Sequence, residues 1–338
     1  MKICICGGGS LGHVCAGVLG THKDVEVSIY TGHPEQWQAT VSVTDSYGKS
    51  FVTPINKVSS IPKEVISGQD IILFCVPGFL IEKTLLDIRP FIGEAFIGTV
   101  VSSTGFFFFA HQVLGPKAKL FGFQRVPYIA RVKEYGSSAS LLGYKPDLAV
   151  AIEGTDAPEE LRKNLERLFI TPVSRLDNYL EASLTNSNPI LHTGRLYSLF
   201  KGKESFIFDH HILFYKEWTD EASELLIKMD REFFQLLNVL KVTSLPTLLE
   251  YYECNNASSL TKKIQSIPAF QSILCPMLNI NNGWMADFKS RYFTEDFPFG
   301  LRWIHELARV HFIKTPLIDE VYKWGIRQLA TQKREVIH

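Results

Sequence analysis

Short apolar runs alternate with stretches of helical spacing through the first half of the chain. The runs cover residues 2–6, 25–30, 71–76, 96–101 and 148–152, and most are followed at once by Gly, Pro, Ser or Thr. Strands that alternate with helices in this way form a parallel sheet, because each parallel pair needs a crossover connection. We therefore expect residues 1–178 to form an α/β domain built on a doubly wound parallel sheet.

Two further patterns place smaller elements in this half. Residues 39–43 and 50–53 flank the turn sequence Asp45-Ser46-Tyr47-Gly48 and predict an inserted hairpin. Residues 106–109 are four consecutive phenylalanines, a run far shorter than the roughly 20 apolar residues of a membrane span. We expect this run to pack a helix onto the sheet.

The pattern changes from about Leu180 onward. Apolar side chains recur at three-to-four spacing over residues 221–240, at Leu225, Leu226, Met229, Phe233, Phe234, Leu236, Leu237 and Leu240. Such a stripe buries one face of a helix, and the turn signals that would separate strands become sparse. We expect residues 179–338 to form a second, mainly α-helical domain in which strands disappear.

A glycine-rich turn directly follows the first apolar run. It reads Gly7-Gly8-Gly9-Ser10-Leu11-Gly12, which matches the Gly-x-Gly-x-x-Gly pattern of a Rossmann-type dinucleotide site. The helix expected over residues 11–19 points its free N–H groups at the phosphates. A second segment, Val76-Pro77, ends a strand and belongs beside the nicotinamide, since ligands bind at the carboxyl ends of such strands. The residues expected at the cofactor are Gly7, Gly9, Ser10, Leu11, Gly12, Val76 and Pro77.

The end of the second strand bears on which cofactor is bound. An acid usually stands there and binds the adenine ribose hydroxyls, but the strand over residues 25–30 ends in Thr31-Gly32-His33. Because no carboxylate would repel a 2′-phosphate, we expect NADPH to be favoured over NADH, with Thr31 and His33 as its phosphate neighbours. The alternative is that a backbone group holds the ribose and the preference is loose.

The balance of charges excludes several classes of partner. The 338 residues carry 35 Lys and Arg against 35 Asp and Glu, so there is no basic field for nucleic acid or for an anionic membrane surface. The most apolar stretch, residues 71–81, is broken by Pro77-Gly78 and is too short to span a membrane. The first strand begins at residue 2 and leaves no room for a signal peptide, which predicts a cytoplasmic protein.

Cysteine and tryptophan add little to this picture. The six cysteines show no metal or disulfide spacing, and Cys4 and Cys6 fit small buried side chains of the first strand. Trp284, Trp303 and Trp324 fit a homodimer face or interior packing equally well.

Two polar clusters in the helical half are not explained by packing. Residues 185–195 contain Asn188 and His192 four apart, and Pro189 between them marks a helix start or a kink. Residues 291–300 place Arg291 and Asp296 in a predicted loop before a helix over residues 301–310.

With these clusters the chain resembles the opine dehydrogenases, including octopine and nopaline dehydrogenases, over nearly its whole length. The resemblance rests on the glycine loop, Val76-Pro77, residues 126–131, Asn188-Pro189 with His192, residues 291–301 and residues 314–319. It implies a Rossmann domain joined to a helical domain, and NAD(P)H-dependent reduction of the imine formed between a 2-keto acid and an amino acid. It also implies that His192 is catalytic, that Asp296 is its partner carboxylate and that Arg291 binds a substrate carboxylate. Thr193 departs from the Pro of many members, and the chain is somewhat short.

The chemistry of these residue types agrees with the implied roles. Hydride addition leaves negative charge on the oxygen or nitrogen, so a proton donor such as His192 is needed there. A carboxylate on the other ring nitrogen fixes the tautomer, and Arg291 can clamp a carboxylate through two hydrogen bonds. Asn188, on the face of His192, completes the candidate substrate-binding set. The structural alternatives are a satisfied structural His192, Asp296 as a helix N-cap and Arg291 as its ion partner.

Two other functions remain open from the sequence. A ketopantoate-type reductase would reduce a 2-keto acid without an amine, but Leu184 stands four residues before Asn188, where such enzymes place a catalytic Lys. A regulatory protein that senses NADPH would bind the cofactor without chemistry. Oxidation of NADPH with a keto acid, with and without amino acids, separates the three.

Overall fold

The computed structural model describes residues 1–335, with side chains through Thr331. The chain divides into two compact units, Met1–Ser183 and a second that begins at Leu184. We call them the first and second domains and describe each by itself.

An eight-stranded sheet forms the centre of the first domain, in the order β12-β11-β8-β7-β6-β1-β2-β5. Its strands are β1 (Lys2–Cys6), β2 (Glu26–Tyr30), β5 (Lys57–Ser59), β6 (Ile71–Phe74), β7 (Phe96–Thr99), β8 (Leu120–Phe123), β11 (Leu148–Glu153) and β12 (Val173–Arg175). From β5 to β8 every pair is parallel. The α/β fold with a mainly parallel sheet is therefore confirmed.

One end of this sheet differs from the predicted, wholly parallel arrangement. Strand β11 pairs antiparallel with β8, and β12 continues parallel to β11. The connection from β8 to β11 runs through two further strands rather than through a crossover helix. Only a helix-length crossover returns a strand in the same direction, so this end of the sheet reverses.

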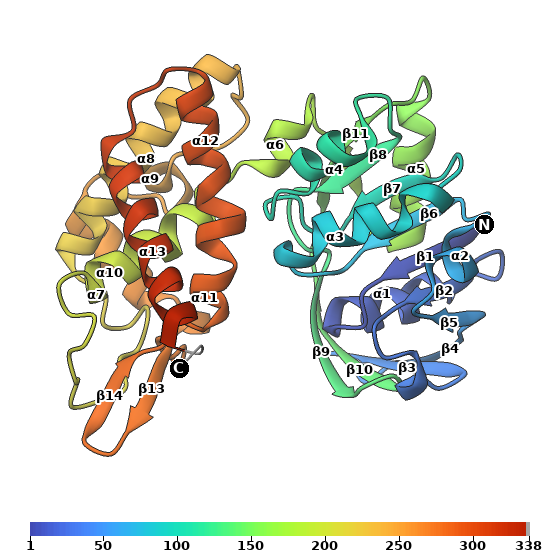
Figure 1. Ribbon diagram of the computed structural model, residues 1–338, viewed down its shortest axis with the longest axis horizontal. Helices are drawn as coiled ribbons and strands as arrows, with labels where there is room; N and C mark the ends of the chain where they lie inside the picture. Colours follow the sequence, from blue (N-terminus) through green and yellow to red (C-terminus); the bar gives the residue numbers. More distant parts are fainter. Residues whose placement is uncertain (336–338) are drawn as a thin grey trace. The chain divides into compact units, whose positions relative to one another are not determined.

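Helices flank the sheet on both sides (Figure 1). They are α1 (Ser10–Leu19), α2 (Pro62–Ile66), α3 (Gly78–Ile88), α4 (Phe106–Leu114), α5 (Pro158–Phe169) and α6 (Tyr179–Ser183). Side chains of α1 and α5 share one hydrophobic core with β1 and β2, while α2, α3 and α4 contact one another in sequence order. As predicted, the phenylalanine run packs a helix, because Phe106, Phe107 and Phe109 of α4 are buried.

A smaller sheet packs on α1 from a second side. Its order is β4-β3-β10-β9, from β3 (Thr40–Asp45), β4 (Ser50–Pro54), β9 (Tyr128–Glu134) and β10 (Ser138–Tyr144). The β3–β4 hairpin confirms the predicted insertion. Small residues let this sheet approach the helix closely: a Cβ on Gly17 would lie 2.3 Å from Val43 Cγ2, and one on Gly20 2.0 Å from Thr53 Cγ2.

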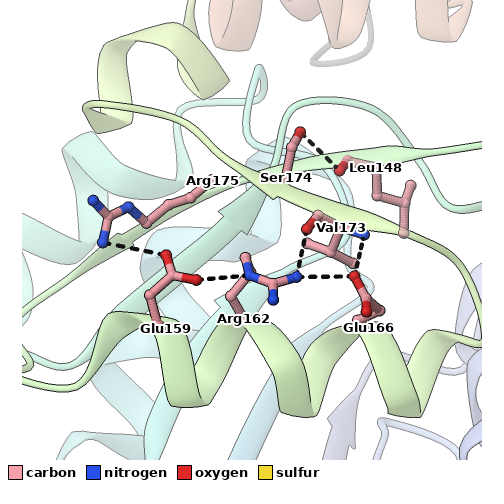
Figure 2. A network of polar contacts seen from close by, with 7 residues as sticks. All are labelled: Leu148, Glu159, Arg162, Glu166, Val173, Ser174 and Arg175. Carbon is pink, nitrogen blue, oxygen red and sulfur yellow. Dashed lines mark hydrogen bonds and ion pairs between the residues drawn. The ribbon is translucent and has the colours of Figure 1, made fainter.

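Charged side chains of α5 hold the edge strand β12 in place (Figure 2). Arg162 donates to Glu159 at 2.8 Å, to Glu166 at 2.9 Å and to the Val173 carbonyl at 2.8 Å. Glu166 in turn accepts the Val173 N–H at 3.0 Å. Both main-chain groups of Val173 are thus satisfied by the helix, which covers an edge that would otherwise offer free hydrogen-bonding groups.

The second domain is mainly helical, as predicted. Its helices are α7 (Thr193–Phe200), α8 (Asp220–Leu240), α9 (Leu248–Tyr251), α10 (Ala257–Ser266), α11 (Arg291–Thr294), α12 (Arg302–Val310) and α13 (Pro316–Glu335). The long helix α8 contacts α7, α10, α12 and α13. Its predicted stripe is largely buried, at Leu226, Met229, Phe233, Leu236 and Leu237.

The expectation that strands disappear after Leu180 is wrong at one place. Strands β13 (Met277–Ile280) and β14 (Gly283–Ala286) form an antiparallel hairpin. The two strands are joined by Asn281-Asn282, and Gly283 takes a φ of +143°, a conformation that a residue without Cβ adopts readily. Within residues 1–335, no helix combines the length and apolar composition needed to cross a membrane.

Candidate active site

Two π-helical turns of the second domain carry three of the candidate site residues, Asn188, His192 and Asp296. The first, η3, covers Ser187–His192 and runs into α7, and the second, η5, covers Asp296–Leu301 and runs into α12. Each has proline at its third position, Pro189 and Pro298. Proline has no N–H for an i→i−4 bond, and single π turns of this kind occur often at functional sites.

The sequence predicted the first of these turns better than the second. Pro189 was expected at a helix start or kink, and it lies in the widened turn before α7. Residues 291–300 were expected to form a loop, which is wrong, because they form the short helix α11 and then η5. The two turns contact each other, and Gly300 allows this: a Cβ there would lie 3.1 Å from Pro189 Cγ.

The packed turns bring His192 and Asp296 together. His192 Nδ1 lies 2.9 Å from Asp296 Oδ2, with side chains 14% and 16% exposed. A carboxylate only accepts hydrogen bonds, so Nδ1 carries a proton. Nε2 is then the ring nitrogen that can accept a proton or donate one. Asp296 is not an N-cap, because it is the first residue of η5, whose N-cap residue is Glu295.

Tyr215 occupies the other side of the ring, and sequence reasoning missed it. Its hydroxyl lies 3.0 Å from His192 Nε2. Its ring is buried and stacks on Phe270 at 4.1 Å and Trp218 at 6.0 Å between centroids. Burial raises the pKa of Tyr215 well above its ordinary value, so it stays a neutral phenol. No spacing pattern links it to residue 192, because the contact is tertiary.

Arg291 and Asn188 stand apart from this line of hydrogen bonds. Both are exposed, and within the described part of the chain the side chain of neither forms a hydrogen bond or an ion pair. The structure therefore does not pair Arg291 with Asp296. Tyr292, the next residue, lies against the His192 ring at 4.9 Å between centroids.

A different asparagine fixes the start of η3. Asn186 is buried and donates to Asp230 Oδ1 at 2.8 Å and to the Pro246 carbonyl at 3.0 Å. Asp230 of α8 also accepts the Leu248 N–H at 2.8 Å. Burial raises the pKa of Asp230 to about 6, although both hydrogen bonds oppose the shift.

The glycine loop of the first domain is shaped as its sequence suggests. Gly7 has a φ of +117°, and a Cβ there would lie 2.7 Å from the Cys75 carbonyl oxygen and 3.0 Å from Val76 Cγ1. A Cβ on Gly12 would lie 1.9 Å from the Gly7 carbonyl oxygen. Around Gly9, in contrast, a Cβ would meet nothing within 4 Å.

The start of α1 fits the phosphates of a dinucleotide. Gly9 is its N-cap residue, and no side chain of the described residues caps it, so the first N–H groups of α1 are free to bind an anion. The Ser10 hydroxyl oxygen accepts the Val132 N–H at 3.1 Å, and Leu11 packs on the core. Pro77 is the N-cap of α3, next to Val76.

Thr31 and His33 follow β2 but lie in different surroundings. Thr31 is buried, with its Oγ1 3.0 Å from the Tyr135 hydroxyl, and it accepts the His33 N–H at 3.4 Å. The His33 side chain is 65% exposed and lies 3.6 Å from Glu35.

Comparisons with known proteins agree with this arrangement. The alpha-helical domain of NAD/NADP octopine/nopaline dehydrogenases matches residues 175–327. Opine dehydrogenase of Haliotis discus hannai is 26% identical, with 98% of this chain and 91% of that protein covered. Octopine dehydrogenase of Mizuhopecten yessoensis is also 26% identical, covering 98% and 90%.

Solved structures are similar in fold. Octopine dehydrogenase with NADH and L-arginine matches with a TM-score of 0.88 at 22% identity, covering 98% of this chain and 90% of that one. Yersinopine dehydrogenase with NADP+ matches with a TM-score of 0.77 at 14% identity, covering 99% of this chain and 92% of that one. A ketopantoate reductase from Ralstonia eutropha gives 0.66 at 15% identity, covering 98% and 100%.

The fold and these matches define a two-domain, NAD(P)-dependent oxidoreductase. The chain is an enzyme that is similar to the opine dehydrogenases over nearly its whole length, in agreement with the resemblance found in the sequence. A regulatory protein without chemistry is thereby set aside. Relatives have been solved with NADH and with NADP+, and the preference of this chain stays a prediction.

Proposed function

We propose that the enzyme joins a 2-keto acid to an amino acid by reduction of the imine they form. Condensation of the keto carbonyl with the amine releases water, and the imine carbon then accepts a hydride while its nitrogen gains a proton. The observation that supports this most is the line Asp296–His192–Tyr215, at 2.9 Å and 3.0 Å. Octopine dehydrogenase has been solved with NADH and pyruvate, and with NADH and L-arginine.

The first domain holds the cofactor in this proposal. The free N–H groups at the start of α1 bind the pyrophosphate next to Gly9, and Thr31 and His33 lie on the adenosine side. Val76 and Pro77, after β6, line the nicotinamide side. When bound, the reduced nicotinamide supplies the hydride.

His192 donates the proton in this mechanism. Asp296 holds the Nδ1–H, so the protonated ring carries its transferable proton on Nε2. The Tyr215 hydroxyl is the partner of Nε2, so the proton passes through it: the Tyr215 oxygen takes the Nε2 proton as the hydroxyl gives its own proton to the imine nitrogen, and Tyr215 stays a neutral phenol. Asp296 balances the positive charge of the imidazolium, which lowers the cost of forming it in a largely buried place.

Substrate carboxylates are the proposed partners of Arg291 and Asn188. Both are exposed residues of the segments that carry Asp296 and His192. A guanidinium binds a carboxylate through two parallel hydrogen bonds, and an amide adds one more.

We further propose that NADPH is preferred over NADH and that the enzyme works in the cytoplasm. Thr31 stands where a carboxylate would repel the 2′-phosphate. All six cysteines are free, which fits a reducing compartment.

The test follows cofactor oxidation by absorbance, with pyruvate or ketopantoate, each with and without a panel of amino acids that includes L-arginine. Opine synthesis predicts oxidation that depends on the amine, faster with NADPH than with NADH. Oxidation by a keto acid alone would instead identify a ketopantoate-type reductase. A strong preference for NADH would contradict the cofactor proposal but not the reaction.

A further inference from the structure

The tip of the β9–β10 hairpin lies on the glycine loop of the first domain. The hydroxyl of Tyr135, at this tip, is 3.0 Å from Thr31 Oγ1. A Cβ on Gly8 would lie 2.3 Å from the same hydroxyl oxygen and 3.0 Å from Thr31 Oγ1. This explains why the variable position of the Gly-x-Gly motif is itself glycine here: the phenol of Tyr135 takes the space a side chain would fill.

His13 of α1 ties this tip to the loop. Its Nε2 accepts the Gly136 N–H at 2.7 Å, and its Nδ1 donates to the Gly9 carbonyl at 3.0 Å. These two partners define a neutral ring, and burial accordingly lowers the pKa of His13. The ring is fully buried and stacks on Trp37 at 4.4 Å between centroids. Tyr135 is therefore placed by the fold.

The place where Tyr135 lies has a known use in dinucleotide-binding folds. The glycine loop approaches the pyrophosphate, and the residue after the second strand binds the hydroxyls of the adenosine ribose. The Tyr135 hydroxyl is next to both, at Gly8 and at Thr31. The side chain that normally binds the ribose, an acid, is absent, and a fixed phenol from another sheet stands in its region.

We propose that Tyr135 recognises the 2′ position of the cofactor's adenosine ribose, with Thr31 as its fixed partner. Thr31 Oγ1 accepts the His33 N–H at 3.4 Å and lies 3.0 Å from the Tyr135 hydroxyl, where either oxygen can donate. With Thr31 as the donor, the phenol proton is left for the ligand. An uncharged donor binds a 2′-phosphate or a 2′-hydroxyl without repulsion, whereas a carboxylate accepts only the hydroxyl. The inference rests on the proposed function in one respect, that the first domain binds NAD(P)H.

The test is Tyr135→Phe in the full-length enzyme, with NADPH and NADH titrated by fluorescence in the absence of keto acid. The variant keeps the ring on Gly8 and removes only the donor. Loss of a hydrogen bond to a charged acceptor predicts that the Kd for NADPH rises about tenfold, and that for NADH by less. Adenosine 2′,5′-bisphosphate should lose affinity in parallel, while kcat at saturating cofactor stays unchanged.

Tyr144→Phe is the matched control. Tyr144 lies on β10 of the same sheet, and its hydroxyl donates to Asp45 at 3.4 Å, so this variant loses a hydroxyl but no predicted ligand contact. Thr31→Val is a second variant, which removes the hydroxyl that holds Tyr135 in place. It should also weaken the binding of NADPH.

The outcomes separate the inference from the proposed function. If Tyr135→Phe and Thr31→Val bind both cofactors as the wild type does, Tyr135 has no part in ribose recognition, while the reaction stands. If the wild type binds neither cofactor, the proposed function itself fails. A fall in kcat with an unchanged Kd would also overturn the role.

Discussion

Both nitrogens of the His192 ring have partners, and the two partners are unlike. The Asp296 carboxylate only accepts hydrogen bonds, while the buried phenol of Tyr215 can donate or accept. The ring therefore changes its protonation state without losing either contact, because Tyr215 only turns its hydroxyl. This suits a group that must lose a proton in each turnover and regain it.

Two substitutions should separate chemistry from binding at this site. His192→Ala removes the proton donor, and kcat should fall by about 10² to 10⁴, while NADPH fluorescence still reports binding.

Arg291→Ala should raise the KM for the keto acid with a smaller effect on kcat. If its KM for NADPH rises instead, Arg291 binds cofactor phosphate rather than substrate.

His210→Ala is the matched control for the first variant. His210 also pairs with carboxylates, Asp209 at 2.6 Å and Glu217 at 2.8 Å, but its side chain is 58% exposed. The His210→Ala variant should keep wild-type turnover. Unchanged turnover in His192→Ala would rule out its role as the acid.

His13 should make stability depend on pH. Because burial lowers the pKa of His13 in the folded state, the unfolded chain takes up its proton first as pH falls. The contribution is complete above the ordinary value near 6.5 and is lost as pH falls from there toward the folded pKa. Urea midpoints at pH 8 and pH 5.5 should therefore differ more for the wild type than for His13→Ala. An equal difference would show that other groups carry the pH dependence.

At the scale of elements, a side chain of one helix caps the start of another. The start of α13 has no partner for its first N–H groups within the helix, and Glu232 of α8 fills this role. Its carboxylate accepts the Leu317 N–H at 3.0 Å and 3.1 Å and the Ile318 N–H at 2.9 Å. One carboxylate thus joins two helices that are distant in sequence. Its negative charge also interacts favourably with the positive end of the α13 helix dipole.

Glu232→Ala should destabilise the protein by about 1–2 kcal/mol, as loss of a helix cap does. Chemical denaturation measures this as a lower midpoint with an unchanged slope. Glu224→Ala, at an exposed position of the same helix, is the control and should stay near the wild type. Equal midpoints for both variants would mean that water replaces the carboxylate at no cost.

Elements with one strong period could be predicted from the sequence, and those shaped by contacts could not. The glycine loop, the strands of the parallel sheet and the stripe of α8 follow from local patterns. The η5 turn does not, because Asp296-Phe297-Pro298 contains the usual signal for a break, and only packing of Gly300 on Pro189 shows why the chain stays helical. The β13–β14 hairpin was missed because its strands, Met277–Ile280 and Gly283–Ala286, contain a single β-branched residue, Ile280.

At the scale of the whole chain, the sequence predicted the order of the two kinds of domain but not which distant residues meet. Tyr215 and Tyr135 are examples. Neither tyrosine belongs to a recognisable motif in its own segment. Tyr215 contacts His192 and Tyr135 contacts Thr31, and both partners are distant in sequence. Contacts of this kind depend on packing angles and strand register, which no local pattern contains.

The hydrogen bond between His13 and Gly136 has a consequence for how the chain is made. It joins residues 123 positions apart, and ribosomes add about 5–20 residues per second. The glycine loop therefore leaves the ribosome on the order of ten seconds before the hairpin that completes it. A nascent chain stopped before residue 136 should carry the whole motif and yet bind nucleotide poorly, because the hairpin that holds the loop is still missing.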